Sequence, residues 1–100
     1  MSRTILRLPA DHPSVEGHFP GNPIFPGALL LDEILHAIAR SRGQLVTAWL
    51  VKSAKFLRPV RPGDELEMEL TAAPGGDIRF HCRIGALEVV TGLARSDDTA

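Results

Sequence analysis

Apolar and polar residues alternate most clearly in the second half of the chain. Residues 65–70 (ELEMEL) alternate acidic and apolar side chains, and in residues 78–84 (IRFHCRI) every second side chain from Ile78 is apolar. A period of two is typical of strands that pack one face and turn the other toward water. The pattern therefore predicts strands at residues 65–72, 78–84 and 87–94, preceded by a longer strand at residues 45–57.

Short connections rich in proline or glycine separate the later strands. They lie at residues 59–64 (PVRPGD), 74–77 (PGGD) and 85–86 (GA), and turns of this kind favour antiparallel neighbours. A further short strand is predicted at residues 4–8. Pro9 closes this strand and indicates that it lies near a sheet edge.

A helix is predicted at residues 28–40 (ALLLDEILHAIAR). This segment contains neither proline nor glycine, begins after Pro26 and Gly27, and has Gly43 beyond its end as a stop signal. Nine of its thirteen residues are apolar and they occupy more than one face, so we expect the helix to be buried on most sides. Together the elements predict an α+β fold in which an antiparallel sheet wraps around one central helix.

Composition narrows the possible functions. A chain of 100 residues with 44% hydrophobic content is expected to form one domain over residues 1–100, small enough that a partner subunit would cover leftover apolar surface. The net charge of −1 comes without blocks of like charge, which argues against binding to nucleic acid or to an anionic membrane surface. No apolar run is long enough to span a bilayer.

The cysteine content and the first residues favour a cytoplasmic location. Cys82 is the single cysteine, so it has no partner for an internal disulfide, and residues 1–10 lack the apolar run of a secretory signal. Cys82 also lies on the apolar side of its predicted strand. We therefore interpret it as a packing residue rather than a nucleophile.

Three residues near the helix start are candidates for chemistry. His18 lies in a loop, residues 9–27, whose prolines hold the backbone in few conformations, as a catalytic loop requires. Asp32 lies on an apolar helix, where an acid costs stability unless it is paired, solvated or functional. Gly27 leaves backbone N–H groups free to meet a developing negative charge. The ordinary alternatives are local packing for His18 and a favourable charge near the positive helix end for Asp32.

These residues belong to a longer motif. Residues 17–32 (GHFPGNPIFPGALLLD) resemble the signature of the 3-hydroxyacyl-acyl carrier protein dehydratases, a loop of the form GHFPGxPxxPG that runs into the central helix of a hotdog fold. Residues 54–65 (AKFLRPVRPGDE) are similar to a second segment of that family, ARFxRPVxPGD. With a similar strand pattern up to the end, the resemblance covers most of the chain.

The resemblance implies a hotdog domain that removes water from a 3-hydroxyacyl thioester in fatty acid, related lipid or polyketide synthesis. It makes His18 the base that takes the C2 proton, Asp32 the acid that protonates the C3 hydroxyl, and the Gly27 N–H a donor to the thioester oxygen. Substrate contacts are expected from Phe19, Phe25, Pro26 and His36.

The resemblance also implies partners. The substrate would be a thioester of acyl carrier protein or coenzyme A, no metal or organic cofactor would be needed, and the chain would form a homodimer or a higher homo-oligomer with shared active sites. In these sites His18 of one subunit works with Asp32 of the other. Because acyl carrier proteins are usually acidic, Lys55, Arg58 and Arg61 are candidates for a basic rim, with solvated surface charge as the alternative.

Two positions depart from the family pattern. Asp32 stands where the branch that only dehydrates usually has glutamate, and aspartate is typical of the branch that also isomerises the double bond. The Ala-x-x-Gln that usually follows is replaced at Glu33 and His36, and His36 lies one helical turn after Asp32, where it can hydrogen-bond the acid or serve a structural role. Two other functions stay open: a hotdog acyl thioesterase and a catalytically weak paralogue that binds acyl chains or carrier protein.

Overall fold

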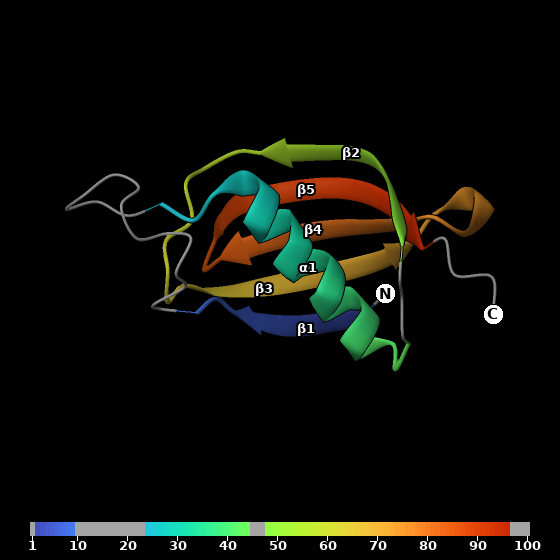
Figure 1. Ribbon diagram of the computed structural model, residues 1–100, viewed down its shortest axis with the longest axis horizontal. Helices are drawn as coiled ribbons and strands as arrows, with labels where there is room; N and C mark the ends of the chain where they lie inside the picture. Colours follow the sequence, from blue (N-terminus) through green and yellow to red (C-terminus); the bar gives the residue numbers. More distant parts are fainter. Residues whose placement is uncertain (1, 10–23, 45–47, 97–100) are drawn as a thin grey trace.

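The computed structural model describes residues 2–9, 24–44 and 48–96. Over these ranges the chain forms an antiparallel five-stranded sheet with the strand order β1-β3-β4-β5-β2, and α1 lies across one face of it (Figure 1). The elements are β1 Ser2–Arg7, α1 Gly27–Ser41, β2 Trp49–Phe56, β3 Glu65–Ala72, the 3₁₀ turn η2 Pro74–Gly76, β4 Ile78–Ile84 and β5 Leu87–Ser96.

The predicted α+β layout is confirmed, with small differences at the ends of elements. β3 and β4 have the predicted bounds, α1 is one residue longer at each end, and β5 continues to Ser96. β1 begins two residues earlier than predicted and lies at a sheet edge, as Pro9 indicated. β2 begins at Trp49 and ends at Phe56, so it is shorter than the predicted strand, of which residues 45–47 lie outside the described ranges.

The alternation in β3 and β4 sets the two faces of the sheet. The apolar positions of both strands are buried and pack with the buried face of α1 into one core, while the charged positions lie on the other face. The strand members of this core include Leu66, Met68, Leu70, Ile78, Phe80 and Cys82.

The ring of Phe80 leaves no room for a side chain at Gly92 on β5. The two residues are paired across β4 and β5, and a Cβ added at Gly92 would collide with the Phe80 ring and lie 2.6 Å from the Ser53 carbonyl oxygen. The missing side chain therefore lets the largest fully buried side chain of the core occupy the centre of the sheet.

The prediction that the helix is buried on most sides is confirmed, except along one stripe. The stripe contains the exposed residues Asp32, His36 and Arg40. The buried residues of α1 are Leu30, Ile34, Leu35, Ala37, Ile38 and Ala39. The stripe stays exposed because, in the described ranges, no segment packs on the side of α1 opposite the sheet (Figure 1). Among the described residues, no helix is both long and apolar enough to cross a membrane.

An ion-pair cluster ties three strands together at the end of the sheet near η2. The carboxylate of Asp77 is 7% exposed and accepts hydrogen bonds from Lys52 Nζ on β2, at 2.8 Å, and from Arg95 Nε on β5, at 2.9 Å. These two hydrogen bonds, first that of Lys52 and then that of Arg95, hold the pKa of Asp77 below the ordinary value of an aspartate. The carboxylate is therefore the charged link between β2, β4 and β5.

We predict that Asp77→Asn lowers the free energy of unfolding and changes its dependence on pH. Because the folded-state pKa of Asp77 lies below the unfolded value, the stabilisation is complete above the unfolded pKa, about 4, and is lost as the pH falls through the folded pKa. Urea unfolding between pH 3 and pH 7 should show a shallower acid-side decline in the variant. Glu65→Gln, which removes an exposed pair with Arg7, should leave the profile nearly unchanged. Equal profiles for wild type and Asp77→Asn would contradict the prediction.

Candidate active site

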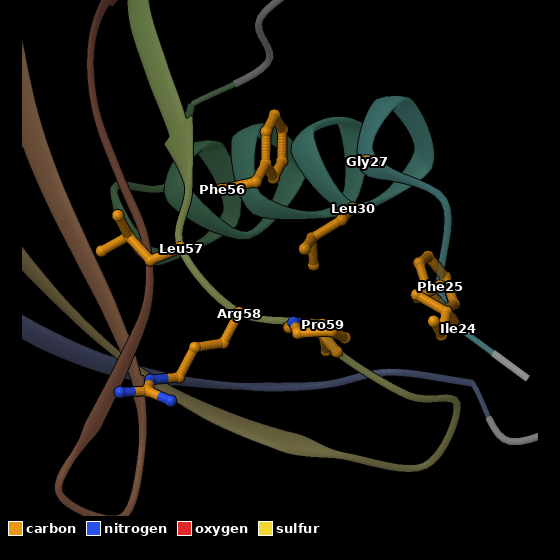
Figure 2. Close-up of a pocket in the computed structure, with 9 residues that line it drawn as sticks. Ile24, Phe25, Gly27, Leu30, Phe56, Leu57, Arg58 and Pro59 are labelled. Carbon is orange, nitrogen blue, oxygen red and sulfur yellow. The ribbon is translucent and has the colours of Figure 1, made fainter. Parts of the chain in front are cut away.

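A pocket of about 290 Å³ opens at the start of α1 (Figure 2). This volume is near the lower end of the range for small-molecule sites, about 300–1,000 Å³. Its walls come from two stretches that are far apart in the sequence, the chain entering α1 and the chain leaving β2. The lining residues are Ile24, Phe25, Gly27, Leu30, Phe56, Leu57, Arg58, Pro59 and Val60.

Direct contacts hold these two stretches together. The N–H of Phe25 donates a hydrogen bond of 2.6 Å to the carbonyl oxygen of Val60. Gly27 lies against the ring of Phe56, since a Cβ at Gly27 would be 3.5 Å from Phe56 Cζ. Figure 2 shows Leu30 pointing from α1 toward Pro59. The two segments that resemble one family at the sequence level thus meet in one pocket.

Gly27 begins α1 and lines the pocket. It is the first residue of α1, and Pro26 before it is the N-cap, with φ −58° and ψ 141° and no side-chain cap. The Leu30 N–H donates to the Pro26 carbonyl oxygen at 2.9 Å, so the N–H groups of Gly27, Ala28 and Leu29 precede the first intrahelical bond. Helix starts of this kind favour negative charge. The helix start at Gly27 therefore lies at the pocket.

Asp32 lies on the side of α1 that faces away from this pocket. It follows Leu30 by two residues, which is a rotation of about 200° around the helix, and its side chain is 63% exposed. His36 Nδ1 lies 3.5 Å from Asp32 Oδ2, one turn along the helix. The expected proximity of His36 to Asp32 is therefore present. The helix itself is largely buried, but Asp32 lies on its exposed stripe rather than among the buried residues.

The remaining predicted residues divide into three groups. His18 and Phe19 lie outside the described residues. Phe25 is buried and lines the pocket, and Pro26 caps the helix beside it. Within the described ranges, no group of three or more His, Cys, Asp or Glu side chains is arranged to hold a metal ion.

The pocket wall that follows β2 was not predicted from the sequence. Phe56 and Leu57 are consecutive apolar residues at a strand end, and both are about half exposed. Consecutive residues of a strand point to opposite faces, so at least one of these two apolar side chains had to lie outside the core. This pair of apolar residues was the signal in the sequence that could have predicted the pocket wall. Of the three rim candidates, Arg58 lines the pocket, Lys55 lines a different pocket, and Arg61 is exposed in the following turn.

Cys82 is confirmed as a packing residue. Its side chain is fully buried in the core under α1, and burial raises the pKa of the thiol to about 12. Burial and the raised pKa together keep the thiolate, the reactive and metal-binding form, both scarce and out of reach.

Comparison with known proteins identifies the family that this chain matches. Residues 2–92 match the ApeI-like family, described as ApeI dehydratase. A curated protein from Cronobacter sakazakii, "3-hydroxyacyl-[acyl-carrier-protein] dehydratase FabZ", is 38% identical over 69% of this chain and 52% of its own length. The protein of the same name from Yersinia enterocolitica is 39% identical over 68% of this chain and 46% of its own length. The chain thus spans about half the length of the curated relatives it matches.

Solved structures share the fold. The dehydratase heterocomplex ApeI:P from Xenorhabdus doucetiae superposes with a TM-score of 0.70 at 23% identity, over 93% of this chain and 83% of that chain. A point mutant of the fluoroacetyl-CoA-specific thioesterase FlK superposes with a TM-score of 0.65 at 13% identity, over 96% of this chain and 87% of that chain. At these identities the likeness shows the fold alone.

The burial of Cys82 predicts that the native chain resists alkylation. At pH 8 iodoacetamide should label Cys82 slowly in the native chain and rapidly in denaturant, because labelling needs an exposed thiolate. A matched control is Ala86→Cys, exposed in the β4–β5 turn, in a Cys82→Ala background. Mass spectrometry should find this control labelled at least about ten times faster. Equal labelling rates in the two native proteins would contradict the assigned burial.

Proposed function

Because the chain belongs to the ApeI-like dehydratase family, we propose that it removes water from a 3-hydroxyacyl thioester to give a 2-enoyl thioester. The names of the curated relatives state this activity. The observation that carries the proposal is the pocket at the start of α1, which both family-like segments build and which Gly27, the first residue of the helix, lines. An apolar pocket with a backbone donor suits an acyl thioester whose carbonyl oxygen gains negative charge during the reaction.

The chemistry is a balanced elimination that needs only proton transfers. His18 takes the C2 proton, the electrons of the C2–H bond form the C2=C3 double bond, and the C3–O bond breaks as Asp32 protonates the departing hydroxyl. The Gly27 N–H donates to the thioester oxygen while charge builds there. The elimination is redox-neutral and side chains of the protein carry out both proton transfers, so this proposal includes no metal and no organic cofactor. Phe25 and Leu30 form the apolar wall along the acyl chain.

The position of Asp32 supports an active site shared between two subunits. The carboxylate projects from the side of α1 opposite Leu30 and does not line the pocket of its own chain. A second subunit whose α1 lies alongside would bring its Asp32 toward this pocket and cover the exposed helix face. His36 then acts as a positioning residue that holds the Asp32 carboxylate.

The edge strand β2 supports the same assembly. Among the strands that the structure describes, β2 has β5 as its single neighbour. β2 also carries exposed apolar side chains, with Leu50 53% and Phe56 47% exposed. An open apolar edge is closed when a second copy adds its own β2 across a two-fold axis. The ApeI structure from Xenorhabdus doucetiae is a heterocomplex, ApeI:P, so a related but different chain is the alternative partner.

The substrate carrier in this proposal is acyl carrier protein, as in the names of the curated relatives, with coenzyme A as the alternative. Arg58 lies in the pocket lining and is exposed. Figure 2 shows its side chain extending away from Phe25. In this position the guanidinium meets an acidic carrier at the pocket mouth rather than the acyl chain inside.

The reaction can be tested in the hydration direction, because the elimination is reversible. The wild-type chain should remove the ultraviolet absorbance of a 2-enoyl thioester, and His18→Ala and Asp32→Asn should each slow this by about 100-fold or more, the usual contribution of one general acid or base. Glu65→Gln, an exposed carboxylate on β3, is the control and should keep the wild-type rate.

Three outcomes of that assay count against the proposal. Release of free thiol without any change in the double bond would identify a thioesterase. No turnover at any chain length, with binding of acyl chains or carrier retained, would identify a binding paralogue. Full activity in His18→Ala would remove the assigned base.

The shared site predicts complementation between inactive variants. Co-expressed His18→Ala and Asp32→Asn chains should form mixed dimers in which one site holds both substitutions and the other holds neither. With random pairing, about half of the dimers are mixed, so about a quarter of all sites should regain activity. If tagged-subunit pull-down shows mixed dimers and the rate stays at that of the parent variants, the two residues do not work across the interface.

A further inference from the structure

A second pocket lies on the face of the sheet that α1 does not cover. It has a volume of about 150 Å³, and all of its lining residues are in strands: Ser53, Lys55, Arg79, His81, Thr91 and Gly92. Because side chains alternate along a strand, Lys55 points to the opposite face from Phe56, whose ring lies against the start of α1. The pocket is separate from the candidate active site, and its function does not depend on the acyl chemistry.

The strand register brings the polar groups of this pocket together. Thr91 on β5 lies opposite His81 on β4 and opposite Lys55 on β2. Ser53 and Arg79 each lie two residues along from these positions, so they point to the same face. Neighbouring strands are about 4.8 Å apart. An ammonium, a guanidinium, an imidazole and two hydroxyl groups therefore border one small space.

Lys55 and Arg79 differ from the strand cations that form ion pairs with carboxylates. Among the described residues, carboxylates pair with five strand cations: Arg3, Arg7, Lys52, Arg83 and Arg95. Lys55 and Arg79 have no carboxylate partner in the part of the chain that the structure describes. Glu88, next to the pocket lining, has its Oε1 atom 3.2 Å from His81 Nδ1. Within the described ranges the pocket thus keeps two positive charges that no carboxylate pairs.

We propose that this pocket binds a phosphate group. Its donors match a tetrahedral oxyanion: the Arg79 guanidinium can take two oxygens, the Lys55 ammonium supplies a compact charge, and the hydroxyls of Ser53 and Thr91 donate to the remaining oxygens. The volume of about 150 Å³ is well below that of sites for drug-sized ligands, so the pocket suits one phosphate rather than a whole cofactor.

The phosphate can come from two sources that share this chemistry. One is free inorganic phosphate, and the other is the phosphate of a larger ligand, such as the nucleotide end of coenzyme A. Titrations with inorganic phosphate and with adenosine 3′,5′-bisphosphate distinguish them. Similar affinities indicate that the free ion suffices, whereas tighter binding of the bisphosphate through the same residues identifies the nucleotide as the source.

The test follows backbone amide resonances in the full chain by NMR, at constant ionic strength set with chloride. Inorganic phosphate should shift the signals of Lys55, His81 and Thr91 in a saturable way. Lys55→Ala and Arg79→Ala should each weaken binding by about tenfold, since each removes a charge-assisted hydrogen bond. Both side chains are exposed, so circular dichroism should show an unchanged fold.

Arg83→Ala is the matched control. Arg83 lies on β4 with Arg79, but Glu67 and Glu69 already pair with it, so this variant should bind phosphate within about twofold of wild type. Equal weakening in Arg83→Ala and Arg79→Ala would show a diffuse charge effect and overturn the site. Signal shifts of the same size with chloride would also overturn the site. Saturable binding of polyglutamate without any response to phosphate would overturn it as well and would identify a surface for acidic proteins.

Discussion

One constraint governs this structure: the apolar face of a five-stranded sheet has to be buried, and within the described residues α1 is the only α-helix that covers it. The helix crosses the sheet and covers the middle strands, where Leu66, Met68 and Phe80 are fully buried. The coverage ends at β2. There the inward side chain of Phe56 reaches the start of α1 but is still about half exposed. The pocket and the open edge both follow from this incomplete coverage.

The same constraint determines where the helix start and Asp32 lie. The hydrogen bond from Phe25 to Val60 holds the residues that enter α1 beside the segment that follows β2. The start of the helix, where negative charge is favoured, therefore lines an apolar pocket. The far side of α1 has no cover in the described part of the chain, so Asp32 projects outward, where it can serve the reaction only if a partner completes the site.

Much of the fold could be predicted from the sequence, because it depends on local patterns. Strict alternation in residues 65–70 and 78–84 defined the bounds and faces of β3 and β4, and the uninterrupted apolar segment after Gly27 defined α1. The burial of the helix on most sides could also be predicted, because its apolar residues occupy more than one face. Only the tertiary arrangement shows that Asp32 and His36 lie on the stripe that stays exposed.

The candidate site was predictable in part, for a similar reason. Gly27 and Phe25 belong to a contiguous motif, so their proximity could be predicted from the sequence. Phe56 and Arg58 follow some thirty residues later, and their place in the pocket depends on β2 lying beside the start of α1. The basic pocket around Arg79 was not predicted because it depends on which of the strand cations lack a carboxylate partner, which only the register decides.

If one active site needs two chains joined along β2, the species that turns over substrate must contain at least two chains. Active-enzyme sedimentation measures this property, because it follows the moving boundary of 2-enoyl thioester consumption and gives the mass of the active species. A shared site predicts that activity sediments with twice the 10.8 kDa mass of the chain or a larger even multiple. Activity that sediments with the mass of a single chain would contradict it.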